Sequence, residues 1–317
     1  MNSFSILLVL KDRTSYTKRL MRKWNSEKFP FKILIADGGK SQEIQNLLSN
    51  KNNFENLNYE YIKHPFDATL EDFYAKMSSA VMKIDTATTC LMDNDDFIEV
   101  EGIKRCLDIL EDKSYSSARG LMEDMNGNNI YNLYPDSIIE KTALERMISQ
   151  TKKFHGNWHN IAKTKHIQAM WKMIQVICPL NFRIVEQITG YLNTMWGNSY
   201  RGNFPWMYHE YGQRIQTESG DLGSHFPSQE SWINSNYWLE EFNKLTEIVG
   251  AAISYHDRIP IDEALKIFRE SYHFKIPDLK GLLDNRISQA FDLGYNYNKI
   301  DEMFDIMSDL NIERVNQ

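Results

Sequence analysis

The chain has 317 residues, of which 42% are hydrophobic and 25% are charged. These values are typical of a globular protein with one large domain or two smaller ones. The net charge of -7 argues against nucleic-acid binding, because phosphate backbones are bound by basic surfaces.

The sequence carries no signal for secretion or membrane insertion. Its first apolar run has no basic residue before it and ends at Lys11, which does not fit a signal peptide. The sequence contains no run of about 18 apolar residues, the length that a membrane-spanning helix needs. The three cysteines lack metal-site spacing and fit a reducing compartment. We expect a cytoplasmic protein, and attachment to the inner face of the cytoplasmic membrane stays open.

Apolar runs alternate with helical patterns over the first hundred residues. Short unbroken apolar runs predict buried strands over residues 5–10, 31–36, 59–62 and 88–92. Apolar residues at helical spacing predict helices over 13–24, 41–48 and 70–83. This alternation indicates an α/β unit with a largely parallel sheet.

The later part of the chain changes character. A helix is predicted over 102–112, a strand over 116–122, a hairpin turn at 126–129 and a helix over 138–150. Residues 152–211 are rich in aromatics. Successive helices are predicted over 230–254, 261–272 and 278–309.

Polar clusters follow three of the predicted strands. They are Lys11-Asp12-Arg13, Asp37-Gly38 and the acidic run 93–96. Ligands of parallel α/β sheets bind outside the carboxyl ends of strands. We therefore expect the three clusters to meet at one rim of the sheet.

The acidic run 93–96 needs a physical reason, since three carboxylates in four positions repel one another. A solvated turn is one explanation. A divalent cation is the other, because Mg²⁺ and Mn²⁺ take oxygen ligands and are shared with substrate phosphates. The position after a buried strand favours the cation.

The strand-end motifs also resemble a known family. Residues 10–13, 35–39 and 91–97 resemble the opening motifs of family-2-type glycosyltransferases with the GT-A fold. The block 73–98, with 102–106 and 115–116, is similar to a bacterial subgroup found among surface-polysaccharide genes. The resemblance covers residues 1–125 and, less closely, 150–245.

The resemblance implies an α/β fold of the GT-A type, a Rossmann-like, mixed and mostly parallel sheet flanked by helices. The helical C-terminal region would be an extension of it. The implied GT-A domain covers residues 1–225, with a nucleotide-sugar-binding half at 1–125 and an acceptor half at 126–225. Residues 226–317 would form the helical region.

The same resemblance assigns the donor and metal sites. It implies that the nucleotide sugar contacts Lys11, Arg13, Asp37, Gly38, Asp93 and Asn94. Asp37 would contact the base and Asp93 the ribose. Asp95, Asp96 and His209 would hold Mn²⁺ or Mg²⁺. His209 could instead donate to the donor phosphates, and Arg201 and Arg214 are alternative candidates for that phosphate contact.

The base and the acceptor contacts are implied by later segments. Residues 182–191 resemble the segment that carries the general base, and Glu186 is the best match. In relatives a second acid follows and acts as the base, but this chain has Gln187 there. Glu186 is therefore either the base or an acidic residue on the helix surface, in which case the base lies elsewhere. Trp158 and His159 are candidate acceptor contacts, or alternatively part of a buried aromatic turn.

The sequence thus predicts a metal-dependent glycosyltransferase. It would move a sugar from a nucleotide-activated donor to a hydroxyl of a surface glycan or of a lipid-linked saccharide, with inversion. A sugar nucleotidyltransferase is an alternative, although the segment after the first strand lacks the glycines of a phosphate loop. A degenerate, non-catalytic GT-A module is another.

Overall fold

The computed structural model describes residues 4–124, 136–152, 154, 156, 158–209, 229–272, 280–291 and 293–314. The chain groups into two compact units that alternate along the sequence. The first contains residues 1–137, 159–167 and 199–222, and the second contains 138–158, 168–198 and 223–317. The sequence-based division at residue 225 stays a prediction. None of the described helices has the length and apolar character needed to span a membrane.

The first unit is built on four parallel strands. They are β1 (Phe4–Leu10), β2 (Lys32–Asp37), β3 (Tyr59–Lys63) and β4 (Thr88–Met92). Every residue of β1 and β4 is buried, as expected of strands covered on both faces. β1 pairs in parallel with β2 and β4, and β2 with β3. The four strands predicted from apolar runs are confirmed within about a residue.

Four further strands complete a mixed sheet. They are β5 (Phe97–Ile98), β6 (Tyr115–Asp124), β7 (Ile161–Lys163) and β8 (Asn198–His209). The strand order is β3-β2-β1-β4-β7-β6-β8-β5, with antiparallel pairing of β4 with β7, β6 with β7 and β5 with β8. This confirms the α/β class and the strand predicted over 116–122. The turn predicted at 126–129 lies outside the described residues.

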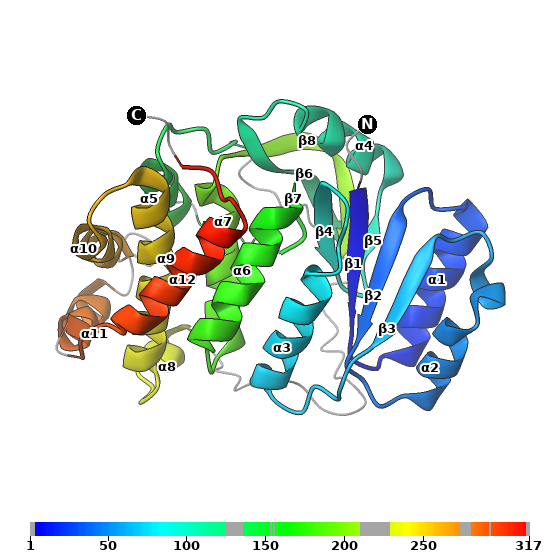
Figure 1. Cartoon of the computed structure of the whole chain (residues 1–317), viewed down its shortest axis with the longest axis horizontal. Helices are drawn as coiled ribbons and strands as arrows, with labels where there is room; N and C mark the ends of the chain where they lie inside the picture. Colours follow the sequence, from blue (N-terminus) through cyan, green and yellow to red (C-terminus); the bar gives the residue numbers. More distant parts are fainter. Residues whose placement is uncertain are drawn as a thin grey trace. The chain divides into compact units, whose positions relative to one another are not determined.

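Helices cover both faces of the parallel strands. In Figure 1, α1 (Thr14–Glu27) and α2 (Gln42–Ser49) lie on one side, and α3 (Leu70–Val81) lies on the other. The strand order requires this, because the chain moves outward from β1 to β3 and then returns to β4 by right-handed crossovers. The unit also contains the 3-10 helix η1 (Lys51–Phe54) and α4 (Val100–Ile109).

The second unit is helical. Its helices are α5 (Ala143–Lys152), most of α6 (Thr164–Ile177), α7 (Phe182–Met195), α8 (Gln229–Ile233), α9 (Trp238–Asp257), α10 (Ile261–Tyr272), α11 (Lys280–Phe291) and α12 (Tyr297–Asp309). Helix α9 is central: it is buried along most of its length and contacts α5, α7, α10, α11 and α12.

Two predicted C-terminal helices are each divided. The pattern over 230–254 becomes α8 and α9, and the pattern over 278–309 becomes α11 and α12. Gly294 adopts φ +68° between the latter pair, a conformation that ends a helix. The side chain of Asn296 then caps α12 by accepting from the backbone N–H of Lys299. Local chemistry thus interrupts an apolar period that continues across the break.

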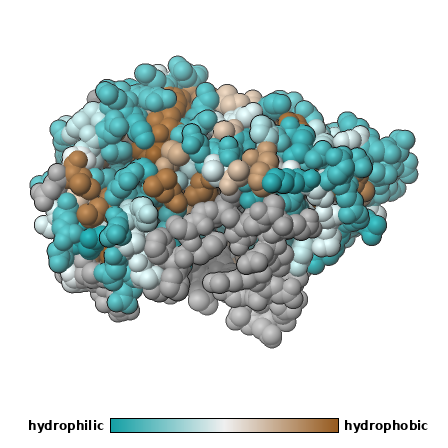
Figure 2. Space-filling view, turned by 90° about the horizontal axis from the view of Figure 1, so that it is seen from below, coloured by the Kyte–Doolittle hydropathy of each residue, from teal (hydrophilic) through white to brown (hydrophobic). Residues whose placement is uncertain are grey.

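The surface is largely polar. Figure 2 shows a face with mostly hydrophilic residues and small hydrophobic groups among them. Within the described part of the chain, the large hydrophobic residues that are exposed are Met82, Ile139, Leu180, Tyr237, Leu293 and Tyr297. All but Met82 belong to the helical unit.

Candidate functional site

The segment after β1 ties the ends of three strands together. Asp12 and Arg13 both have positive φ, at 60° and 56°, so the chain turns sharply where β1 ends. The buried Asp12 Oδ1 accepts hydrogen bonds from the backbone N–H groups of Lys40 (2.7 Å) and Ser41 (3.1 Å), which follow β2. The Arg13 guanidinium pairs at 2.8 Å with the Asp95 carboxylate, which follows β4. The predicted meeting of the strand-end clusters is therefore found.

Asp37, the predicted base contact, ends β2 and is 1% exposed. Its Oδ1 accepts from the backbone N–H of Gly39 at 2.7 Å, and its Oδ2 accepts from the Tyr61 hydroxyl at 2.7 Å. Burial, together with that hydrogen bond, raises the pKa of Tyr61. A Cβ on Gly38 would lie 2.3 Å from the Asp67 carboxylate, so the close approach requires glycine there. The roles of Asp37 and Gly38 in donor binding stay predictions.

A buried ion pair lies beside this loop and was not predicted. The Lys76 ammonium pairs with Asp67 Oδ2 and also donates to the Leu10 carbonyl at 3.0 Å. Both charged side chains are at most 1% exposed. A signal was present in the sequence, because Lys76 sits at helical spacing between Phe73 and Ala80 on the apolar face of α3. A lysine at such a position needs a buried partner.

His64, which follows β3, gives the stability a pH dependence. It is 8% exposed, and burial together with the positive charge of Lys76 lowers the pKa of its imidazole to about 4. Below its ordinary pKa near 6.5, the unfolded chain takes up a proton that the folded chain refuses. We expect acidification from pH 6.5 to 4 to remove about 3 kcal/mol of stability through this residue. The unfolding midpoint should therefore fall more steeply toward low pH in the wild type than in His64→Gln. An equal fall in both proteins would show that other groups cause the loss.

The residues of the acidic run 93–96 face two different sets of partners. Asn94 and Asp95 face α1: the Asn94 amide donates to the Thr17 hydroxyl at 2.9 Å, and Asp95 pairs with Arg13. The Asp95 carbonyl also accepts from Arg19. These contacts anchor the run to α1 and leave Asp93 and Asp96 for other partners.

Asp93, Asp96 and His159 form a group whose ligand atoms all lie within 4.8 Å of one another. Asp96 is fully buried, with His209 Nδ1 2.5 Å from its Oδ1 and His159 Nε2 3.4 Å from its Oδ2. Burial raises the pKa of Asp93 to about 6, against the opposing effect of His159. The hydrogen bond to Asp96 raises the pKa of His209.

The hydrogen bond of the other ring nitrogen defines how His159 faces this group. His159 Nδ1 lies 3.0 Å from the Leu91 carbonyl oxygen. A carbonyl can only accept, so Nδ1 carries the hydrogen, and in the neutral form of the ring the lone pair of Nε2 points toward Asp96. Asp96 Oδ2 is buried and has no hydrogen-bond donor among the described residues. A cation between these two acceptors would satisfy both, and the residues therefore fit a metal ion.

Of the other predicted site residues, Lys11 and Arg201 belong to the first unit, and Glu186 and Trp158 belong to the second. Glu186 is exposed on α7. The Trp158 ring packs on Trp171 and Phe182, with ring centroids 5.6 and 5.8 Å away. Arg214 lies outside the described residues. Their roles as base, acceptor contact and phosphate contact stay predictions.

Comparison with known proteins identifies the fold. A crystal structure of S. aureus TarS 1-349 matches with a TM-score of 0.51 and 14% identity, over 88% of this chain and 92% of that one. The complex of the same fragment with UDP-GlcNAc matches with a TM-score of 0.52 and 14% identity, over 97% and 80% of the two chains. GalNAc-T7 with UDP, GalNAc and Mn²⁺ matches with a TM-score of 0.54 and 11% identity, over 99% and 56%. These proteins are GT-A glycosyltransferases. This chain has the GT-A fold.

The likeness is one of structure rather than of sequence. No family model matches the chain, and no curated protein matches its sequence. The chain spans only a little over half of the GalNAc-T7 chain and of a longer TarS structure. The GT-A fold confirms the α/β architecture with a helical extension that the sequence predicted.

Proposed function

We propose that this protein is a metal-dependent glycosyltransferase that takes its sugar from a nucleotide-activated donor. The observation that carries the proposal is that His159 Nε2 faces the buried Asp96 Oδ2 at the carboxyl end of β4, an oxygen with no hydrogen bond from the described residues. That is the edge at which α/β folds bind ligands. The complexes of TarS with UDP-GlcNAc and of GalNAc-T7 with UDP and Mn²⁺ support the same chemistry.

Asp93, Asp96 and His159 would hold the cation. The imidazole favours Mn²⁺, because Mg²⁺ prefers ligand sets made of oxygen. When bound, the cation neutralises the charge that develops on the departing nucleoside diphosphate. Asp95, the metal ligand implied by the sequence motif, remains the alternative, although its carboxylate is paired with Arg13.

The remaining roles follow the sequence resemblance. Lys11, Asp37 and Gly38 would contact the nucleotide at the ends of β1 and β2. Glu186 would accept the proton of the attacking acceptor hydroxyl. A single displacement with this base inverts the anomeric centre. The acceptor would be a surface glycan or a lipid-linked saccharide, as the sequence resemblance implies.

A test of the whole proposal combines binding with product analysis. UDP and UDP-GlcNAc are the first ligands to try, with and without Mn²⁺, in thermal-shift assays. At about a hundred times Kd, a bound nucleotide adds about 2.7 kcal/mol of stability, and we expect this gain only with Mn²⁺ present.

The products distinguish the alternatives. A transferase releases a nucleoside diphosphate from the sugar donor, whereas a nucleotidyltransferase consumes or forms pyrophosphate. A degenerate GT-A module would bind no nucleotide in a metal-dependent manner. A nucleotide sugar panel that gives neither stabilisation nor turnover would refute the proposal.

A further inference from the structure

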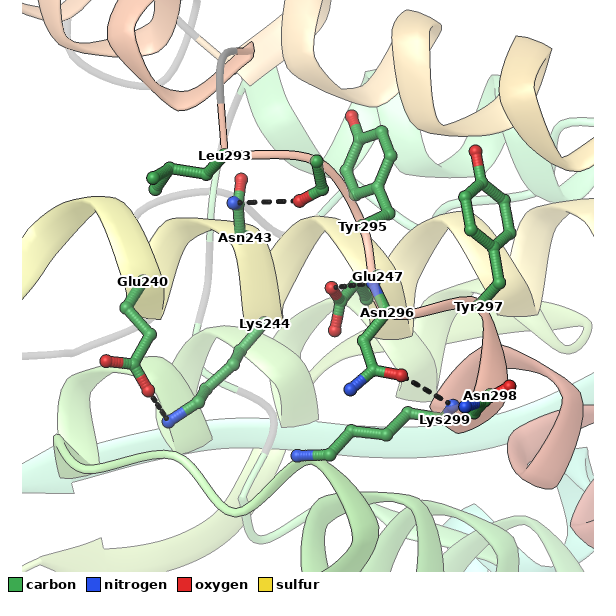
Figure 3. A pocket seen from close by; sticks show the side chains of 11 residues that line it. Glu240, Asn243, Lys244, Glu247, Leu293, Tyr295, Asn296, Tyr297, Asn298 and Lys299 are labelled. Carbon is green, nitrogen blue, oxygen red and sulfur yellow. Dashed lines mark hydrogen bonds and ion pairs between the residues drawn. The ribbon is translucent and has the colours of Figure 1, made fainter.

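The helical unit contains a pocket of about 750 Å³ that the proposed transfer chemistry does not use. It lies between α9 and the segment 293–299, which leads from α11 into α12 (Figure 3). Its volume falls within the range of small-molecule sites, roughly 300–1,000 Å³. All of its lining residues belong to the second unit.

Side chains of α9 hold the segment that forms one wall, through hydrogen bonds to its backbone. The buried Glu247 carboxylate accepts from the N–H of Asn296 at 2.8 Å. The Asn243 amide donates to the carbonyl of Gly294 at 3.3 Å (Figure 3). Because these bonds come from the central helix α9, the wall is pre-organised and a ligand would not need to order it.

The polar lining carries balanced charge. Lys244 pairs with Glu240 at 2.9 Å and donates to the Cys178 carbonyl at 3.1 Å. The Lys299 ammonium approaches the Ile177 carbonyl at 3.4 Å, and Glu247 supplies the second carboxylate. Two ammonium groups therefore accompany two carboxylates in the lining, and the buried Glu241 carboxylate behind it also pairs with Lys244, at 3.1 Å. Such a lining offers donors and acceptors together and favours a ligand without net charge.

An exposed tyrosine lies near the end of the segment, where α12 begins. The ring of Tyr297 is 46% exposed, yet its hydroxyl donates to Asp262 at 2.6 Å and its edge meets the Tyr295 ring at 84°. Arg269 in turn lies 4.2 Å from the Tyr295 ring centroid. An exposed ring with a fixed orientation provides a flat apolar platform. The neighbouring Asn298 amide makes no hydrogen bond within the described residues.

We propose that this pocket binds a neutral oligosaccharide. A sugar ring presents an apolar face that can stack on Tyr297 and hydroxyls that can pair with amide, carboxylate and ammonium groups. Tyr297 and Lys244 line the same pocket and stand at different ends of it in Figure 3, so a ligand that reaches both spans more than one sugar unit. The balanced charge disfavours a phosphate-rich polymer or an anionic lipid surface.

The test measures saccharide binding to the full chain without nucleotide or metal. Cellohexaose, maltohexaose and chitohexaose are the neutral probes, and a hyaluronan hexasaccharide and phosphatidylglycerol vesicles are the anionic ones. We expect at least one neutral probe to bind with a Kd of about 1 mM or tighter by saturation-transfer NMR. Tyr297→Ala should weaken that binding about tenfold, and Asn298→Ala should weaken it less.

Tyr237→Ala is the matched control, because Tyr237 is 60% exposed in the same unit but does not line the pocket. It should bind the neutral probe as the wild type does, and Tyr297→Phe should retain most of the affinity. Binding of no neutral probe, equal loss in Tyr297→Ala and Tyr237→Ala, or binding only to the anionic probes would overturn the proposal. Each result is independent of sugar transfer, since neither donor nor metal is present.

Discussion

Asp96→Asn is expected to reduce sugar transfer by about 10²–10³-fold at saturating donor. The substitution preserves the size of the side chain but removes the charge from a fully buried carboxylate. One amide group would then face His159 Nε2 or the N–H of His209 in place of a carboxylate oxygen. The affinity for Mn²⁺ should fall with the activity, as measured by the Mn²⁺ concentration that half-stabilises the protein in thermal-shift assays.

Asp95→Asn is the matched comparison one residue away. Asp95 pairs with Arg13 rather than with the histidines, so its loss should reduce Mn²⁺ affinity much less than the loss of Asp96. The reverse order of effects would show that the sequence motif assigns the metal ligand better than the geometry does. Equal and full activity in both variants would remove the metal site from the mechanism.

Lys76→Met is expected to destabilise the first unit by about 3–5 kcal/mol. Methionine fills much of the same volume but leaves the Asp67 carboxylate buried without its counter-charge. Burial already raises the pKa of Asp67 against the favourable effect of Lys76, so the variant should take up a proton on folding. Urea unfolding at several pH values measures the loss and its decrease in acid.

Two controls distinguish the cost of an unpaired buried charge from the cost of removing any lysine. Lys104→Met removes an exposed ion pair with Glu101 and should cost at most about 1 kcal/mol. The double variant Lys76→Met with Asp67→Leu removes both buried charges and should regain a large part of the stability. A single variant as stable as the wild type would contradict the structural role of the pair.

The sequence predicted the parallel strands well because each one is a short apolar run ended by polar residues. It also predicted that the clusters at their ends would meet, since parallel strands place their carboxyl ends at one edge. Asp12, Arg13 and Asp95 are indeed linked there. These features follow from local pattern and from the rules of strand connection.

One of the two histidines beside Asp96 was not predicted there, since His209 was grouped with Asp96 but His159 was expected to contact the acceptor. His159 reaches Asp96 because the three-residue strand β7 pairs antiparallel with β4, joining Thr89 to Ala162. So short a strand carries no periodic signal. The role of Lys76 was visible as a charge on an apolar face, but its partner Asp67 lies in a loop without a pattern. Tertiary structure, rather than local propensity, therefore brings His159 to Asp96 and Lys76 to Asp67.

The route of the chain through the first unit has a consequence for its biosynthesis. Asp93 and Asp96 are made early, but His159 and His209 join them only after the intervening segments have been translated. Contacts so far apart along the chain form slowly. A nascent chain released near residue 125 would hold the acidic turn without either imidazole, and its buried carboxylates would repel one another. Pulse-labelled refolding should therefore detect protected amides in β1 and β2 before the histidines become ordered.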